Sequence, residues 1–217
     1  MKNVFLGAAI LTLALTGCKK AEDKAVETST TDTVKVEVPT TESAEAATPP
    51  SQEEMNKAWE AYMKPGDMHK LLAADTGSWK VTMTSFMDPK KPTKEDATAD
   101  IKMTMGGRYQ EASYKGKMMG QPFEGVSTVS YNNASNKFES TWRDNMGTGT
   151  MFVTGDYDPN TKSITFTGNM PDPMTKKDKK FREVFTWVDD NTRKMEMFDT
   201  DPAGKEFKSL EIEMKRK

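Results

Sequence analysis

From Ser78 onward, apolar and polar residues alternate with a period of two in several separate runs, and this pattern constrains the fold more than any other feature. The runs cover residues 79–83, 97–105, 164–168, 181–187 and 210–214. Successive side chains of a β-strand point to opposite faces of the sheet. The pattern therefore predicts antiparallel strands with one face buried and one face in water.

Turn-forming residues separate these runs. They are Asn132-Asn133, Asp158-Pro159-Asn160, Asp189-Asp190-Asn191 and Asp201-Pro202-Ala203-Gly204. About ten short strands with hairpin-like connections are typical of a barrel or a sandwich. An up-and-down meander is the simplest topology, and its closure removes exposed edges. We predict a mainly β protein, an antiparallel up-and-down barrel of about ten strands similar to the lipocalin and nitrobindin barrels.

One or two short helices are expected before the first strand. Ser51 and Glu54 have the spacing of a capping box, and Pro65-Gly66 ends the first helix. Its apolar stripe consists of Met55, Trp59 and Tyr62. We expect Asp67 to cap a second helix, and both helices to plug or flank one barrel end.

The first eighteen residues have the pattern of an export signal. Lys2 is followed by an uncharged stretch of about 13 residues, shorter than the roughly 20 that span a bilayer. Leu15-Thr16-Gly17-Cys18 resembles the lipobox of bacterial lipoproteins. The resemblance implies cleavage after residue 17 and a lipid on Cys18, which would anchor the protein to a membrane. Lys19 in place of aspartate favours the outer membrane, facing the periplasm, in a Gram-negative host.

Residues 18–50 are expected to be a disordered tether. After Cys18 they contain four lysines, seven acidic residues and no aromatic residue, and such a segment buries too little apolar surface to offset its ordering entropy. Its root-mean-square reach is about 30 Å. The predicted organisation is a signal peptide over 1–17, a tether over 18–50 and one barrel domain over 51–217.

Composition excludes several classes of function. The chain has a net charge of −2 and no basic block, so nucleic acid is not an expected partner. Cys18 is the only cysteine and His69 the only histidine, which leaves too few ligands for a zinc or copper site. Methionines at 83, 103, 105, 195 and 197 are expected to fill the barrel interior.

Two carboxylates are predicted to face the interior. Glu183 lies between Phe181 and Phe185, and Asp144 shares a face with Trp142. Because an unpaired buried charge is costly, each needs a partner. The alternatives are an ion pair with an arginine (Arg108, Arg143 or Arg182), a position at a strand end where the face reaches water, or a ligand in an apolar cavity. The candidate pocket residues are Arg108, Tyr131, Trp142, Asp144, Arg182 and Glu183.

His69 has three interpretations. It forms a local hydrogen bond in the second short helix, it binds haem from the proximal side as in nitrobindin-like barrels, or it takes part in catalysis. A serine nucleophile elbow is missing from the sequence. We therefore predict no catalytic residue and no cofactor, with haem as the alternative.

Several ordered motifs resemble a known bacterial family. They include Pro65-Gly66-Asp67-Met68-His69-Lys70, Gly77-Ser78-Trp79, Gly106-Gly107-Arg108-Tyr109, Gly120-Gln121-Pro122-Phe123-Glu124-Gly125, Thr141-Trp142-Arg143-Asp144 and Phe181-Arg182-Glu183. Over roughly residues 55–217 the chain is similar to domain of unknown function 1579. The resemblance implies a lipocalin-like barrel and no established activity, ligand or catalytic residue. Ser130 replaces the glycine that is usual at this position in the family.

We predict a membrane-anchored binding module for a small apolar or amphipathic ligand in the cell envelope. The alternative is a structural or protein-interaction lipoprotein with a filled barrel and an unknown protein partner. A hydrolase or a haem-binding protein is the third hypothesis.

Overall fold

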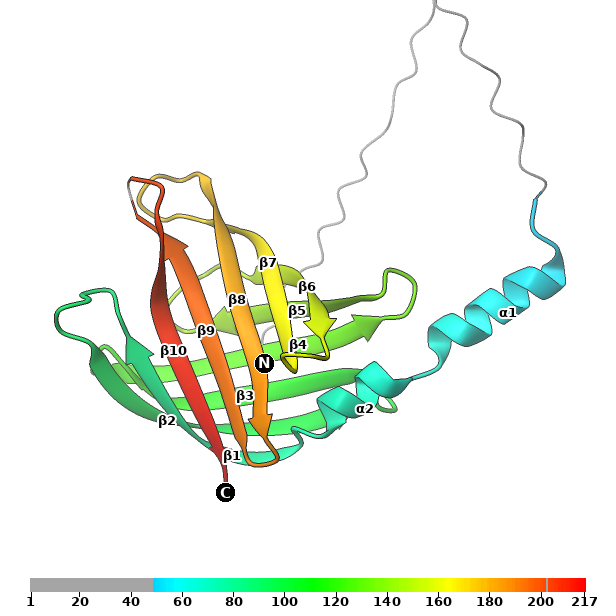
Figure 1. The fold of residues 1–217 in the computed structure, drawn as a ribbon, viewed down its shortest axis with the longest axis horizontal. Helices are drawn as coiled ribbons and strands as arrows, with labels where there is room; N and C mark the ends of the chain where they lie inside the picture. The colour runs from blue at the N-terminus through cyan, green and yellow to red at the C-terminus, as the bar shows by residue number, and fades with distance from the viewer. Residues whose placement is uncertain (1–48, 202) are drawn as a thin grey trace, which may run out of the picture. The chain divides into compact units, whose positions relative to one another are not determined.

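Ten antiparallel strands form a closed barrel in the computed structural model, which describes residues 49–201 and 203–217 (Figure 1). The strands are β1 (Gly77–Ser85), β2 (Thr93–Thr104), β3 (Tyr109–Met118), β4 (Gln121–Asn132), β5 (Lys137–Asp144), β6 (Met151–Asp158), β7 (Ser163–Pro171), β8 (Asp178–Asp189), β9 (Thr192–Thr200) and β10 (Glu206–Arg216). Each strand pairs with the next in the chain, and β1 pairs with β10. The predicted up-and-down barrel is confirmed. The predicted signal peptide, Cys18 and the tether up to residue 48 lie outside the described residues.

The barrel closes through a regular ladder between β1 and β10. The register runs from Trp79 opposite Arg216 to Ser85 opposite Leu210. Pairing the first strand with the last leaves neither with a free edge, which removes the commonest template for aggregation of a sheet protein.

The β3–β4 hairpin illustrates how local sequence sets the register. Met119 and Gly120 both have positive φ, 51° and 73°, as a two-residue type I′ turn requires. Glu95 accepts hydrogen bonds from both backbone N–H groups at 2.6 Å. This side chain of β2 therefore stabilises a turn that would otherwise be strained at Met119.

Two helices precede the barrel, α1 (Gln52–Met63) and α2 (Asp67–Ala73). The predicted capping box of Ser51 and Glu54 is present. Helix α2 lies at one end of the barrel, against β2, β3 and β4, and buries Leu72 (Figure 1). Helix α1 buries no residue, and Trp59 is 62% exposed. The expectation that the helices cover a barrel end therefore applies to α2 and is wrong for α1.

The cap of α2 differs from the prediction. Gly66, not Asp67, is the N-cap residue, and its N–H group donates to Nδ1 of His69 at 3.0 Å. Asp67 is already helical and pairs with Lys70 at 2.8 Å. The imidazole of His69 thus reaches back to the backbone N–H of the N-cap residue, as the fourth residue of a capping box does, while Gly66 has no side chain with which to cap the first turn.

The barrel interior contains two hydrophobic clusters. One centres on Trp79 and Val81 of β1, and the other on Phe138 and Ile164 with Leu72 of α2. Burial of each large apolar side chain contributes about 1.5–3 kcal/mol. The two clusters together fill much of the barrel interior, and a cavity lined by residues of both remains.

Four of the five methionines that were predicted to face the barrel interior do so. Met83, Met195 and Met197 line the interior space, and Met103 packs on the second cluster. Met105 is 71% exposed and has φ 49° in the β2–β3 turn. Its predicted inward position is wrong because the strand ends at Thr104 and the chain reverses there.

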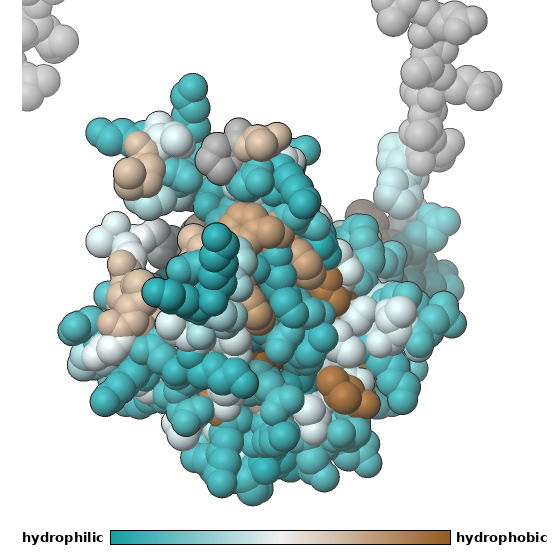
Figure 2. Space-filling view, turned by 60° about the vertical axis from the view of Figure 1, so that its left-hand side comes forward, coloured by the Kyte–Doolittle hydropathy of each residue, from teal (hydrophilic) through white to brown (hydrophobic). Residues whose placement is uncertain are grey.

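The outer surface is mainly polar. Figure 2 shows a face of hydrophilic side chains with a few separate hydrophobic groups. No helix within the described ranges, 49–201 and 203–217, has the length and apolar character needed to cross a membrane.

Candidate functional site: an apolar cavity with a buried carboxyl group

A cavity of ≈ 180 Å³ lies inside the barrel between the two hydrophobic clusters. Its lining comes from nine strands (β6 through Met151 alone) and from the α2 end. Aromatic and methionine side chains form much of the wall, including Tyr114, Phe123, Trp142, Phe185, Trp187, Met118, Met195 and Met197. A concave, mostly apolar wall with a few convergent polar groups is typical of a small-molecule site.

Three of the six predicted pocket residues line this cavity: Trp142, Asp144 and Glu183. Trp142 Nε1 donates to Asp144 Oδ2 at 2.6 Å. The other carboxylate oxygen of Asp144 accepts from the backbone N–H groups of Met146 and Gly147 at 2.9 and 3.2 Å. Asp144 is therefore satisfied within the β5–β6 turn and fixes the indole ring of Trp142 in the wall.

Arg108 lies away from the cavity. It follows the β2–β3 turn and donates to the carbonyl oxygens of Met105 and Met63, at 3.1 and 2.7 Å. The predicted pocket role of Arg108 is not supported by this placement. Its guanidinium instead connects the end of α1 to the barrel.

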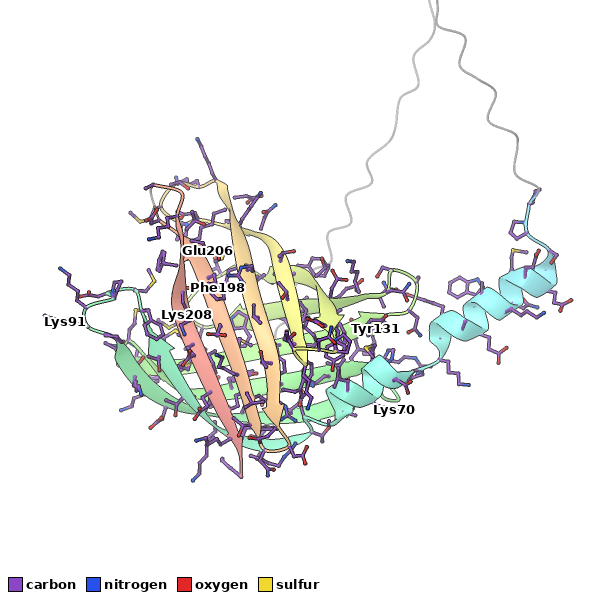
Figure 3. All side chains as sticks on the ribbon, viewed as in Figure 1. Lys70, Lys91, Tyr131, Phe198, Glu206 and Lys208 are labelled. Atoms are coloured by element: carbon purple, nitrogen blue, oxygen red, sulfur yellow. The ribbon has the colours of Figure 1, made fainter. Side chains whose placement is uncertain are left out.

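Arg182 lies on the outer face of β8. It pairs with Glu206 at 2.6 Å, and its guanidinium lies 3.7 Å from the ring centroid of Phe198. Figure 3 places Glu206 and Phe198 together, away from Tyr131, which lies beside α2. The predicted pocket position of Arg182 is wrong for a simple reason: its neighbour Glu183 points inward, and consecutive residues of a strand face opposite sides.

Tyr131 does not line the cavity either. It packs on the second cluster, with its ring 4.9 Å from that of Phe138 and 6.0 Å from that of His69. Its phenol donates to Asn136 at 3.4 Å. Tyr131 therefore supports the contact between α2 and the barrel.

Glu183 is the unusual group of the cavity. Its side chain is 8% exposed, and its strand neighbours across β7 and β9 are Phe166 and Met197. Burial alone raises the pKa of Glu183 to about 7. In the described part of the chain, Glu183 has neither the predicted arginine partner nor any other ion pair.

Tyr114 is the polar group whose titration Glu183 influences. Burial raises the pKa of the Tyr114 phenol, the charges of Glu183 and Asp75 raise it further, and a hydrogen bond with Ser127 opposes them. The phenol thus stays protonated at neutral pH. It offers a hydroxyl group near the buried carboxyl group, inside an apolar wall.

Comparison with known sequences gives one family. Residues 64–216 match the family described as "Protein of unknown function (DUF1579)". The chain belongs to the DUF1579 family. No curated protein is significantly similar to it in sequence.

Two solved structures are similar to this DUF1579 protein. Rv2717c from M. tuberculosis is 12% identical, with a TM-score of 0.54 over 71% of this chain and 99% of that one. The S-type phycobiliprotein lyase CPES from Guillardia theta is 9% identical, with a TM-score of 0.49 over 69% of this chain and 92% of that one. The DUF1579 protein is a lipocalin-like β-barrel of unknown function.

His69 of the DUF1579 barrel is 6% exposed and does not line the cavity. Its Nδ1 accepts from Gly66, and the ring also forms a backbone hydrogen bond with Tyr131. Burial, the largest influence, lowers the pKa of His69. Because Nδ1 accepts from Gly66 and the ring lies outside the cavity, the histidine is not positioned to ligate a haem in that cavity.

Metal ligation has no evident site in the described ranges. Nowhere among residues 49–201 and 203–217 do three His, Cys, Asp or Glu side chains gather as ligands of a metal ion.

A buried polar network closes the α2 end of the cavity, and the sequence analysis missed it. Asp75 accepts from Arg193 Nε at 2.7 Å, from Trp187 Nε1 at 3.0 Å and from Gln110 Nε2 at 3.3 Å. Its backbone carbonyl accepts from Trp79 Nε1 at 2.8 Å. Asp75 lies in a turn, outside any periodic run. The alternation of Gln110, Ala112 and Tyr114 could have indicated the inward face of β3. It is hard to recognise because Gln110 is polar and Ala112 is small.

Gly125 makes room for Trp142. A Cβ atom at Gly125 would lie 2.5 Å from two atoms of the indole ring, well inside van der Waals contact. The missing side chain at Gly125 leaves the space that the indole ring of Trp142, on the neighbouring strand, occupies.

Proposed function

We propose that this DUF1579 protein is a binding module that holds a small, mainly apolar ligand inside its barrel. The observation that carries the proposal is a cavity of ≈ 180 Å³ with an apolar wall and the carboxyl group of Glu183 within it. A cavity of about 150 Å³ in a protein core binds benzene. The site thus suits a ligand of about that size or slightly larger.

The wall also suits a ligand of adaptable shape. Met118, Met195 and Met197 contribute flexible, polarizable side chains, which can adjust to an occupant at little energetic cost. A barrel that served only as a rigid scaffold would gain stability from filling this space, because empty apolar cavities destabilise a core. This argument favours the binding module over the alternative of a structural lipoprotein with a filled barrel.

The hydrolase hypothesis has weaker support. Asp144 is hydrogen-bonded to Trp142 and a turn, and His69 lies outside the cavity. Burial raises the pKa of Glu183 to about 7, but a lone carboxyl group without a paired nucleophile does not define a catalytic site.

The binding function is tested by filling the cavity. Ser140 lines the cavity, whereas the next residue, Thr141, does not. The Ser140→Phe variant should lose the binding of small aromatic compounds, measured by quenching of tryptophan fluorescence, while Thr141→Phe keeps it. Unchanged binding in Ser140→Phe, with the barrel folded by circular dichroism, would contradict a ligand site in the cavity.

We also propose that the barrel is exported and held to a membrane by a lipid on Cys18. The support is the sequence Leu15-Thr16-Gly17-Cys18 after an uncharged segment. The lipid would place the barrel in the cell envelope. In a Gram-negative host, the proposed location is the outer membrane, on the side that faces the periplasm.

Metabolic labelling tests the anchor. Cells given an alkyne-bearing fatty acid should label the full-length protein and not its Cys18→Ala variant, which should also leave the membrane fraction. Equal membrane association of both proteins, without labelling, would contradict lipidation.

A further inference from the structure

The carboxyl group of Glu183 faces the cavity without a protein partner. The side chain is 92% buried, since 8% of it is exposed, and it lines the cavity wall. The neighbouring positions on β7 and β9 are Phe166 and Met197, which offer no hydrogen bond to it. A buried polar group normally has a partner, and the cavity that Glu183 lines is a space from which a ligand can supply one.

All charged residues in the described wall of the cavity are acidic. They are Asp75, Asp144 and Glu183, and neither lysine, arginine nor histidine is among the lining residues. Asp75 is paired with Arg193, and Asp144 is bonded to Trp142 and a turn. Among the described residues, the wall therefore carries one acidic group without a protein partner, and it has no cation that would hold the carboxylate or phosphate of a lipid.

Aromatic rings surround the same space. Trp142 lies 5.3 Å from Tyr114 and 6.2 Å from Phe123, measured between ring centroids, and all three line the cavity. The faces of such rings attract cations, with a strength of about 0.5–2 kcal/mol each. The wall thus has the two kinds of group that recognise an organic cation: a carboxyl group and aromatic rings.

We propose that the ligand is a small organic amine, an apolar body with one protonated nitrogen, and that Glu183 receives the nitrogen. This inference depends on the proposed binding function and specifies its ligand class. The volume of ≈ 180 Å³ restricts the body to about the size of one aromatic ring with a short chain.

The titration of Glu183 agrees with this assignment. Burial raises its pKa to about 7, and the groups that share its surroundings are the neutral phenol of Tyr114 and the paired carboxylate of Asp75. An ammonium group in the cavity would favour the ionised carboxylate. Amine binding should therefore weaken as the pH falls below 7 and Glu183 becomes protonated before the ligand binds.

Three compounds of similar shape and different charge test the inference: 2-phenylethylamine, 2-phenylethanol and phenylacetate. Binding to the full-length protein is measured by isothermal titration calorimetry at pH 8 and at pH 5.5. The amine should bind at least tenfold more tightly than the alcohol at pH 8, and phenylacetate should bind most weakly. The preference for the amine should fall at least fivefold at pH 5.5.

The Glu183→Gln variant separates the charge from the shape of the site. This variant should bind the amine and the alcohol with similar affinity. Its affinity for the alcohol should equal that of the wild-type protein. Tighter binding of the alcohol or of phenylacetate by the wild-type protein would overturn the amine assignment and leave the binding function intact. Binding of none of the three compounds would count against both.

Discussion

Arg193 donates from Nε to Asp75 Oδ1 at 2.7 Å, and both side chains are almost completely buried, 3% and 2% exposed. Trp187 and Gln110 complete the hydrogen bonds of the same carboxylate. Of the three carboxyl groups that line the cavity, Asp75 and Asp144 are hydrogen-bonded within the protein, and Glu183 faces the cavity without an ion-pair partner. The contrast separates a structural acid at the α2 end from an acid that is available to a ligand.

The first prediction concerns this pair. Arg193→Met should lower the free energy of unfolding by about 3–5 kcal/mol, because it leaves the buried carboxyl group of Asp75 without its main partner. Urea denaturation measures the change. The additional substitution Asp75→Asn should recover part of the loss.

Arg182→Met is the matched control. Arg182 pairs with Glu206 on the surface, where the two side chains are 32% and 49% exposed, and its loss should cost less than about 1 kcal/mol. If Arg193→Met lowered the free energy of unfolding no more than Arg182→Met does, the Asp75 network would not be a source of stability.

The second prediction concerns pH. Glu183 has a pKa of about 7 in the barrel and 4.5 as its ordinary value, so between these values the folded protein binds more protons than the unfolded chain. Its contribution to stability is therefore complete below about pH 4.5 and is lost as the pH rises to 7. Glu183→Gln should stabilise the empty protein at pH 8 by up to roughly 3 kcal/mol and by little at pH 4.5. Thermal denaturation at the two pH values checks the difference, and an equal effect at both would contradict a buried, unpartnered carboxyl group.

The third prediction concerns Gly125. Gly125→Ala would place a Cβ atom 2.5 Å from the Trp142 ring, so the indole should shift into the cavity. We expect a loss of about 1–3 kcal/mol in stability, a shift in tryptophan emission and weaker ligand binding. Gly147→Ala is the control, because nothing lies within 4 Å of its added Cβ. Identical emission spectra of the two variants would contradict the close packing of Trp142.

The fourth prediction concerns His69. Its ring accepts from Gly66 N–H at the start of α2, and His69→Ala should cost about 1 kcal/mol or more, as loss of a helix cap does. Burial lowers the pKa of His69 below its usual 6.5. Its contribution to stability is therefore complete above pH 6.5 and is lost as the pH falls towards the lower folded value. The free energy of unfolding is compared at pH 5 and pH 8. It should fall less at pH 5 in His69→Ala than in a Lys70→Ala control.

The fold could be predicted largely from alternation, because a half-buried strand imposes a period of two on its sequence. Glu183 and Trp142 were placed correctly for the same reason. The prediction for Arg182 is wrong because it relied on pairing the arginine with an interior carboxylate, whereas the alternation along the strand places Arg182 on the outer face. Asp75 and Arg193 could not be paired, since their contact joins positions 118 residues apart in the chain and only the closed barrel brings them together.

Native mass spectrometry of the full-length protein, purified gently from its own host, tests the central claim most directly. The account predicts a complex with one small molecule, released on denaturation, whose mass and fragmentation show a basic nitrogen on an apolar body. The Ser140→Phe variant should carry none. A wild-type protein that is free of any small molecule, and that also takes up none of the three phenyl compounds, would contradict the account.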